Sequence, residues 1–177
     1  MTITNYTCFE SSFGWVGVAK SDQGITRVTF GAPTEVAIKD RLRNGSHGKR
    51  GLYPLTRNAL DPELLKATEL LTKYFNGVPV DFDIELDLSA GTPFQQRVWK
   101  TALRIPYGTV QSYGWIAREI GNQKAMRAVG GAMGANPLAI IVPCHRVVRS
   151  DGGLGGYAGG LDWKRKLLAM ERKTEAV

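Results

Sequence analysis

The adjacent residues Cys144 and His145 are the strongest candidates for chemistry in this chain. Cysteine is well suited to attack an electrophile near neutral pH, because a few per cent of the free thiol is already thiolate. Neighbouring cations, here His145 and Arg146, would favour the thiolate further. The pair lies in a dense apolar run, residues 140–148, which predicts a buried strand or strand-like segment. A cysteine that only packs inside such a strand is the alternative interpretation.

Two short helices are predicted ahead of this run, at residues 113–120 and 123–135. Ser112 is the expected cap of the first, and Gly121 is expected to end it. Two short helices joined by a tight turn that contains glycine are typical of a helix-turn-helix. A further helix, capped by Thr92, is predicted to end at Leu103 and to bury Phe94, Val98, Trp99 and Leu103.

The predicted helix at residues 123–135 carries almost no large side chains. Glycine costs up to about 1 kcal/mol in a helix interior, so several glycines together need a reason. Small side chains let the backbone come close to another surface, which is either a neighbouring helix or a nucleic-acid groove. Arg127 is the one long basic side chain among the small ones, which are Ala125, Ala128, Gly130, Gly131, Ala132, Gly134 and Ala135.

Residues 149–160 contain six glycines and are predicted to form a loop before the last helix. A linker of this composition would be flexible. Because this segment lies between the candidate nucleophile and the last helix, it is better interpreted as a loop that forms one wall of a pocket. The last helix is predicted at residues 163–171, with Asp162 as its cap. Cations in its first turn oppose the helix dipole, so we expect them to serve an anionic partner; they are Lys164, Arg165 and Lys166.

The first half of the chain has the pattern of a small α/β unit. Segments rich in Thr, Tyr, Phe, Val and Ile predict an antiparallel meander at residues 3–9, 13–20 and 25–30. A helix is predicted at residues 34–42. A second helix, capped by Asp61, is predicted to end at Gly77 and to bury Leu64, Leu65, Ala67, Leu70, Leu71 and Tyr74.

The remaining segments of the first half lead up to the predicted domain boundary. Apolar and acidic residues alternate at 82–88, which predicts a half-buried strand. Residues 44–51 form a basic, glycine-rich loop in which His47 is interpreted as a solvated surface residue. We found neither a nucleophile–base pair nor a phosphate-binding loop in this half. With a linker at 89–92, we expect an architectural domain at residues 1–88 and a functional domain at residues 89–177.

Composition and charge narrow the classes of protein. The chain has 177 residues, 43% hydrophobic and 22% charged, as in an ordinary soluble globular protein, and we identify neither a membrane span nor an export signal. Two cysteines are too few for a disulfide framework, so we expect free thiols in a reducing compartment. Residues 1–88 carry a net charge of −1 and residues 89–177 a net charge of +8. This asymmetry favours a nucleic-acid partner, although a merely basic protein would also show it.

The second half resembles the O6-alkylguanine-DNA alkyltransferases, the methylated-DNA–protein cysteine methyltransferases. The resemblance runs from Thr92 to Glu171 and includes, in family order, residues 94–99, 105–108, 112–113, 127–132, 136–137, 143–147 and 156–160. It implies a ribonuclease-H-like α/β domain followed by a mainly helical domain with a winged-helix-like helix-turn-helix. The implied activity is direct DNA repair. An alkyl group passes once and irreversibly from O6 of guanine, or O4 of thymine, in double-stranded DNA to Cys144 after the base is flipped.

The resemblance also implies roles for individual residues. Cys144 is the alkyl acceptor, His145 the general base acting through a water, and Glu171 the acid that orients His145. Tyr113 helps to turn the base out and protonates guanine N3, and Asn136 is a hinge. Arg127 takes the place of the extruded nucleotide. The other implied DNA contacts are Ala125, Ala128, Gly130 and Gly131, and the implied pocket residues are Val147, Tyr157, Ala158, Gly159 and Ala139.

Some positions depart from the family. Members that bind zinc use Cys and His in the first half, where this chain has only Cys8 and His47, so we expect no metal and no cofactor. Ala158 and Ala139 stand where some members have serine and proline, which puts the tolerance for bulky alkyl groups in doubt. We expect a cytoplasmic monomer, associated with the nucleoid if the source is prokaryotic.

Three other functions fit the sequence less well. A cysteine hydrolase needs a histidine brought to the sulfur from elsewhere in the fold, and His47 is the only spare one. A non-catalytic binder of alkylated DNA would lack the cysteine in this motif, so Cys144 counts against it. A zinc module fails for want of ligands.

Overall fold

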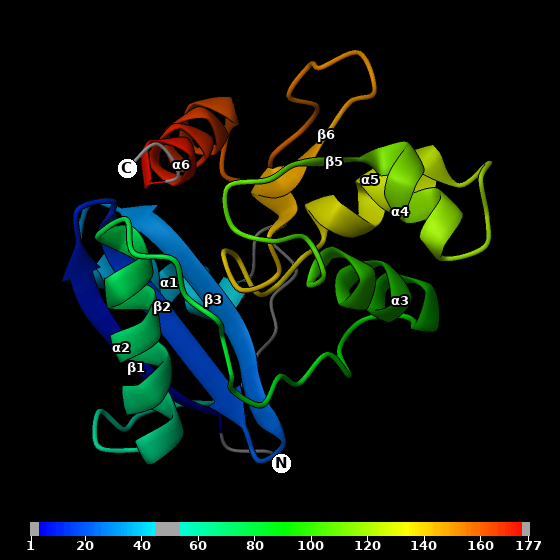
Figure 1. Ribbon diagram of the computed structural model, residues 1–177. Helices are drawn as coiled ribbons and strands as arrows, with labels where there is room; N and C mark the ends of the chain where they lie inside the picture. The colour runs from blue at the N-terminus through cyan, green and yellow to red at the C-terminus, as the bar shows by residue number, and fades with distance from the viewer. Residues whose placement is uncertain (1–3, 45–53, 175–177) are drawn as a thin grey trace. The chain divides into compact units, whose positions relative to one another are not determined.

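The computed structural model describes residues 4–44 and 54–174, which form two compact units. The first contains the described residues up to Leu88 together with Pro137–Ala139, and the second contains Ser89–Asn136 and the described residues from Ile140 onward. Figure 1 follows the chain through both. His47, and the predicted basic loop beyond Asn44, fall outside the described residues. No helix in the described part of the chain is both long enough and apolar enough to cross a membrane.

The first unit is built on a four-stranded sheet whose strands follow the order β3-β2-β1-β4. The three long strands pair antiparallel, which confirms the predicted meander, and the short fourth strand pairs parallel with β1. Gly14, with a φ of 85°, closes the first hairpin, a conformation that favours glycine. The strands are β1 (Thr4–Ser11), β2 (Gly14–Ser21), β3 (Gly24–Ala32) and β4 (Leu55–Arg57).

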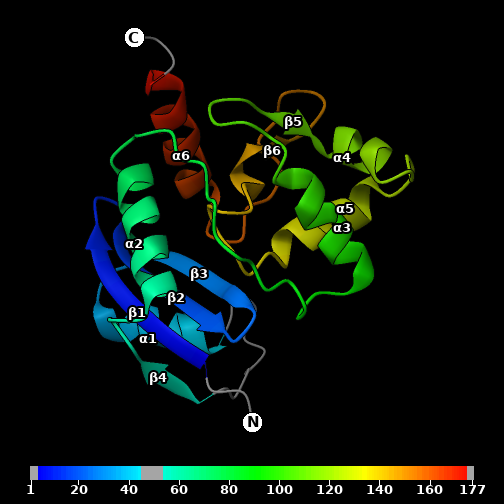
Figure 2. The same cartoon turned by 60° about the horizontal axis from the view of Figure 1, so that its bottom comes forward.

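Two helices, α1 (Glu35–Asn44) and α2 (Pro62–Phe75), cover opposite faces of this sheet (Figure 2). Buried Ile38 and Leu42 of α1 pack where β2 has Gly17, and a Cβ added at Gly17 would lie 2.8 Å from Leu42. On the other face, the ring of Phe75 lies 5.6 Å from that of Phe30.

The sequence-based prediction for α2 is confirmed at its start and partly wrong on its face. The Asp61 side chain accepts hydrogen bonds from the amides of Glu63 and Leu64, as expected of a cap. Leu65 is 51% exposed, so it does not belong to the buried face. The helix buries Leu64, Ala67, Leu71, Tyr74 and Phe75.

The predicted strand at residues 82–88 is wrong. The segment bends at Ile84, whose amide donates to the carbonyl of Phe82. It pairs with β3 at one point only, where the amide of Ile25 donates to the carbonyl of Glu85 and the amide of Asp87 donates to the carbonyl of Ile25. Three residues further along the same edge of β3, Val28 pairs with Pro137–Ala139 instead. Two separate segments thus share this edge of β3, and each forms an isolated bridge instead of a regular ladder. The alternation of apolar and acidic residues correctly predicted that the segment is partly buried, but it did not predict how the segment pairs with other strands.

The second unit consists of helices and two short strands (Figure 1). Thr92 and Gln95 form a capping box at the start of α3, and Ser112 caps α4, as predicted. Leu103 is 39% exposed, so its predicted burial is wrong. The described elements are α3 (Pro93–Ala102), β5 (Gln111–Ser112), α4 (Tyr113–Glu119), α5 (Met126–Gly134), the 3₁₀ turn η1 (Cys144–Arg146), β6 (Val147–Val148) and α6 (Leu161–Thr174).

The segment at residues 140–148, predicted as a buried strand or strand-like segment, is a strand only at its end. Ile140 has a φ of 74° and begins a turn, η1 follows Pro143, and only Val147–Val148 form a strand, paired parallel with β5. The predicted burial is correct, since Ile140 is only 1% exposed. A short apolar run indicates that the segment is buried, but it does not show whether the segment is a strand or another conformation.

Candidate active site

Cys144 begins the η1 turn and is buried, with 9% of its surface exposed. The Asn136 side-chain amide, just after α5, donates to the Cys144 sulfur at 3.3 Å and to the Val142 carbonyl at 2.9 Å. Burial raises the pKa of the Cys144 thiol, and the Asn136 hydrogen bond and the charge of Lys164 offset this only in part. A thiol with a raised pKa needs a base to become an efficient nucleophile.

His145 and Glu171 form a buried pair in the same unit. The His145 Nε2 lies 2.7 Å from the Glu171 Oε1, and both side chains are 0% exposed. Burial lowers the pKa of His145, and the Glu171 carboxylate opposes this effect. Because a carboxylate can only accept, the pair favours the tautomer with the proton on Nε2 and the basic lone pair on Nδ1. The sequence-predicted partnership of His145 and Glu171 is therefore present in the structure.

Glu171 is held by more groups than the resemblance implied. The Arg146 Nε donates to it at 3.0 Å, and the backbone amide of Gly108 donates at 3.1 Å. Burial alone would raise the pKa of Glu171, but the hydrogen bonds from His145 and Arg146 lower it to about 2. Glu171 is therefore an anion that fixes His145 in place.

Arg146 has a different role from the one expected at first. Its guanidinium donates to Glu171 and to the Ile105 carbonyl at 2.8 Å, and it lies 5.5 Å from the centre of the Tyr107 ring. This side chain thus ties Glu171 to the turn before β5. The expectation that Arg146 acts as a cation for the thiolate is not the arrangement found.

Two tyrosines lie near the thiol. The Tyr113 hydroxyl, at the start of α4, donates a long hydrogen bond of 3.4 Å to the Gly156 carbonyl. Burial and the charge of Cys144 raise the pKa of Tyr113, so its hydroxyl is protonated at neutral pH. Burial raises the pKa of Tyr157 well above its ordinary value, and interaction with the Cys144 side chain adds to this. Both tyrosines can donate a proton beside the sulfur.

The other predicted pocket residues are distributed unevenly. Val147 is buried directly after η1, whereas Ala158 and Gly159 are exposed in the glycine-rich loop. Ala139 belongs to the first unit, where its amide donates to the carbonyl of Val28 in β3.

The predicted role of Lys164 is wrong. This lysine was expected to serve an anionic partner, but it is 0% exposed and its ammonium group donates to the carbonyls of Val147 at 2.6 Å, Gly156 at 3.3 Å, and Leu154. Asp162 is not the cap, because α6 begins one residue earlier and Asp162 pairs with Arg165. A signal was present: Lys164, Leu167, Leu168 and Glu171 have the spacing of one buried helix face.

Gly130 and Gly131 of α5 are not explained by packing within the protein, whereas Ala132 of the same helix is buried. A Cβ added at Gly131 would meet nothing within 4 Å, and one at Gly130 would only touch the Tyr113 ring at 4.0 Å. Arg127 and Ala128 are exposed, whereas Ala125 is buried at the N-cap position. Close helix packing therefore does not require the glycine at Gly131.

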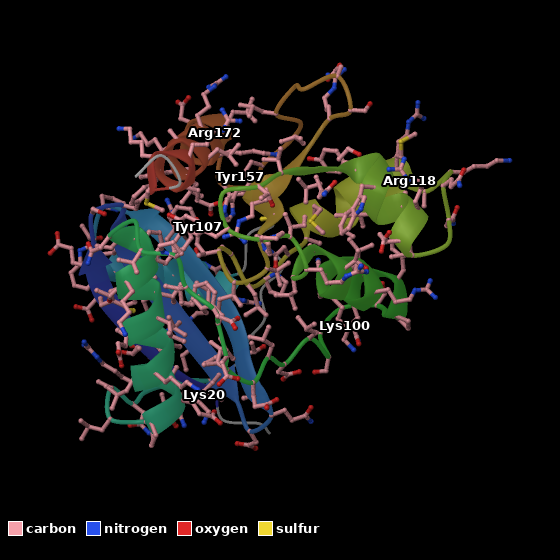
Figure 3. All side chains as sticks on the ribbon, in the orientation of Figure 1. Lys20, Lys100, Tyr107, Arg118, Tyr157 and Arg172 are labelled. Atoms are coloured by element: carbon pink, nitrogen blue, oxygen red, sulfur yellow. The ribbon has the colours of Figure 1, made fainter. Side chains whose placement is uncertain are left out.

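Exposed cations extend from the helices around α5. Figure 3 shows Lys100 of α3 and Arg118 of α4 pointing outward from the ribbon. Other exposed cations of this unit include Arg97, Arg104, Lys124 and Arg127. Among the described residues, no group of three or more His, Cys, Asp and Glu side chains could hold a metal ion.

Comparisons with known proteins agree with this architecture. Residues 4–88 match the model of the 6-O-methylguanine DNA methyltransferase ribonuclease-like domain, and residues 93–173 match the DNA binding domain of the same family. A methylated-DNA–protein-cysteine methyltransferase of Methanosarcina acetivorans is 40% identical over 94% of this chain and 97% of its own length.

Two mycobacterial proteins are also similar. A methylated-DNA–protein-cysteine methyltransferase of Mycobacterium bovis is 58% identical over 60% of this chain, and the matched part spans 64% of that relative's length. A crystal structure of Mycobacterium tuberculosis OGT in complex with DNA superposes with a TM-score of 0.77 at 41% identity, covering 96% of this chain and 93% of that one.

Proposed function

This chain belongs to the 6-O-methylguanine DNA methyltransferase family, and on that basis we propose that it repairs alkylated DNA by transferring the alkyl group from O6 of guanine to Cys144. The observation that carries the proposal is the buried thiol of Cys144 next to the buried His145–Glu171 pair. A thiol with a raised pKa, adjacent in sequence to an oriented neutral histidine, is suited to activation at the moment of reaction.

The reaction has one proton transfer at each end. His145, through a water, takes the proton from the Cys144 thiol, and the sulfur attacks the saturated carbon of the alkyl group. The bond between that carbon and O6 breaks, and guanine leaves as it receives a proton at N3 from the Tyr113 hydroxyl. The product is a thioether, which water does not hydrolyse, so each chain acts once.

The base must leave the duplex before this chemistry can occur, because O6 of guanine lies inside the helix. Flipping costs a few kcal/mol, and a side chain that enters the stack offsets part of this cost. Arg127 is exposed on α5, close to the exposed Gly131, and is suited to that role. The proposal puts α5 in the minor groove of the DNA. We extend the substrate to O4 of thymine in double-stranded DNA. A monomer without a cofactor suffices for the mechanism.

The finer description of the fold belongs to the same proposal. The sheet with two covering helices corresponds to a ribonuclease-H-like domain. The α4–α5 pair with the short β5 and β6 strands corresponds to a winged-helix-like helix-turn-helix. We place the repair reaction in the cytoplasm, where a prokaryotic chain would associate with the nucleoid.

Intact mass after incubation with O6-methylguanine duplex tests the function. We expect a gain of one methylene per chain, located at Cys144, and a stop after one equivalent. Cys144→Ala should bind the duplex and gain no mass, whereas the matched variant Cys8→Ser should still be methylated. Turnover beyond one equivalent, or loss of transfer in Cys8→Ser alone, would overturn the proposal.

Arg127→Ala separates flipping from chemistry. Repair of duplex DNA should slow far more than the reaction with the free alkylated base, because only the duplex requires extrusion. Equal losses on both substrates would show that Arg127 serves the chemistry instead.

A further inference from the structure

A fully buried lysine is rare unless a partner compensates its charge. Lys164 lies in the first turn of α6, where the helix dipole also disfavours a cation. Burial lowers the pKa of Lys164 to about 8, although the charge of Cys144 acts in the opposite direction. A hydrophobic side chain would avoid these costs, so the cation calls for a functional explanation.

The groups around the ammonium indicate what it does. Its three acceptors are backbone carbonyls, from Val147 in β6 and from Leu154 and Gly156 in the glycine-rich loop. Half of the residues at 149–160 are glycines, so most of this loop has no side chain with which to anchor itself. An ammonium group with three donors matches three carbonyls that converge from two segments. Lys164 therefore supplies from α6 the anchor that the loop lacks.

The anchored part of the loop faces the reacting residues. A Cβ added at Gly155 would lie 2.7 Å from the Tyr113 ring, and the Gly156 carbonyl accepts from both Tyr113 and Lys164. Lys164 lies 5.9 Å from the centre of the Tyr113 ring. The next residue, Tyr157, interacts with Cys144. A shift of this segment would therefore disturb both tyrosines at the thiol.

We propose that Lys164 is a positioning residue for alkyl transfer: its ammonium group holds the glycine-rich loop in place beside Cys144. The inference rests on the proposed function, which it deepens. The titratable side chains that interact with Lys164 are Cys144, His145 and Tyr113.

The test compares Lys164→Met, which keeps the length and removes the charge, with Lys173→Met. Lys173 lies on the same helix and is exposed, so the control matches the change in net charge. Three measurements are made: hydrogen exchange of residues 149–160, the pH profile of Cys144 alkylation by iodoacetamide, and methyl transfer from the free base O6-methylguanine. Neither of the first two uses an alkylguanine, so they stay informative if the proposed function fails.

For Lys164→Met we expect faster exchange in the loop and an iodoacetamide profile moved upward by about one pH unit. Transfer from the free base should fall roughly tenfold to a hundredfold, as expected of misplaced reacting groups. Lys173→Met should match the parent in all three. An unchanged loop and an unchanged profile in a folded Lys164→Met would overturn the proposal.

Lys164→Arg separates anchoring from charge. A planar guanidinium keeps the charge but cannot converge on three carbonyls in the same way. Its loop should exchange faster while its iodoacetamide profile stays near that of the parent. If Lys164→Met does not fold, parent-like exchange in Lys164→Arg would still refute the anchoring role.

Discussion

The two units bury different kinds of side chain. Among the described residues of the first unit, the buried polar side chains are Thr4 and Thr7, which carry no charge. The second unit buries His145, Arg146, Lys164 and Glu171 in addition to Asn136 and Thr101. Burying a charge is costly unless it is paired and hydrogen-bonded, so such residues persist where they serve a purpose. The difference supports the proposal that the chemistry lies in the second unit and that the first unit is architectural.

The largest effect is expected from Glu171→Gln, because it breaks the buried network at its centre. Arg146 would lose its counter-charge and His145 the anion that orients it. We expect single-turnover methyl transfer to fall by about 10³-fold and the free energy of unfolding to fall by about 3 kcal/mol.

Glu119→Gln is the matched control for this change. Glu119 pairs with Arg104 at 2.8 Å, but this ion pair lies at the surface, where a pair is worth less than about 1 kcal/mol. Transfer and urea unfolding are measured on both variants. Similar losses in the two would contradict a special role for the buried network.

Acid should weaken the second unit through the same carboxylate. The pKa of Glu171 is about 2 in the folded protein and 4.5 ordinarily, so the folded state binds its proton less readily than the unfolded state. The resulting stabilisation is complete above about pH 4.5 and is lost as the pH falls towards 2, up to about 3 kcal/mol in total. Urea unfolding at pH 5 and pH 3 should show the parent and Glu171→Gln converging at the lower pH. A constant difference would refute this linkage.

Tyr113→Phe tests the acid on the leaving-group side. The Tyr113 hydroxyl makes only a long hydrogen bond to Gly156, so its loss should change the free energy of unfolding by less than about 1 kcal/mol. We expect duplex binding near that of the parent and methyl transfer roughly tenfold to a thousandfold slower, the scale of a lost acid–base group. Transfer at the parent rate would assign the proton to another group or to water.

The smallest effects contrast one glycine from each unit. Gly131→Ala adds a methyl group into open space in α5, so it should stabilise the protein by up to about 1 kcal/mol. Gly17→Ala would press on Leu42 and should destabilise by about 1–3 kcal/mol. Thermal unfolding checks both signs.

If α5 enters the minor groove, Gly131→Ala should also slow duplex repair while leaving the reaction with the free base unchanged. Gly17→Ala should affect the two substrates equally. A Gly131→Ala variant that repairs duplex at the parent rate would argue against contact at this position.

Sequence patterns predicted the structure well where the interacting residues are close together in the chain. Asp61, Thr92 and Ser112 are caps because each side chain reaches amides two or three residues ahead. The antiparallel meander of the first unit was predicted from the residue composition of its strands and from the turn residues between them. The alternating segment at residues 82–88 forms only one bridge, and the apolar run at residues 140–148 forms a strand only at Val147–Val148, because pairing depends on which distant backbone occupies the neighbouring edge.

The sequence by itself determined the candidate nucleophile, the family and the uneven charge, since each depends on residue identity and order along the chain. Only the tertiary structure decided that Arg146 serves Glu171 and that Lys164 is buried against carbonyls. Glu171 receives donors from residues 108, 145 and 146, which are far from it in sequence. Helical spacing indicates that Lys164 lies on the buried face of α6, but the groups that it and Glu171 bind come together only in the folded chain.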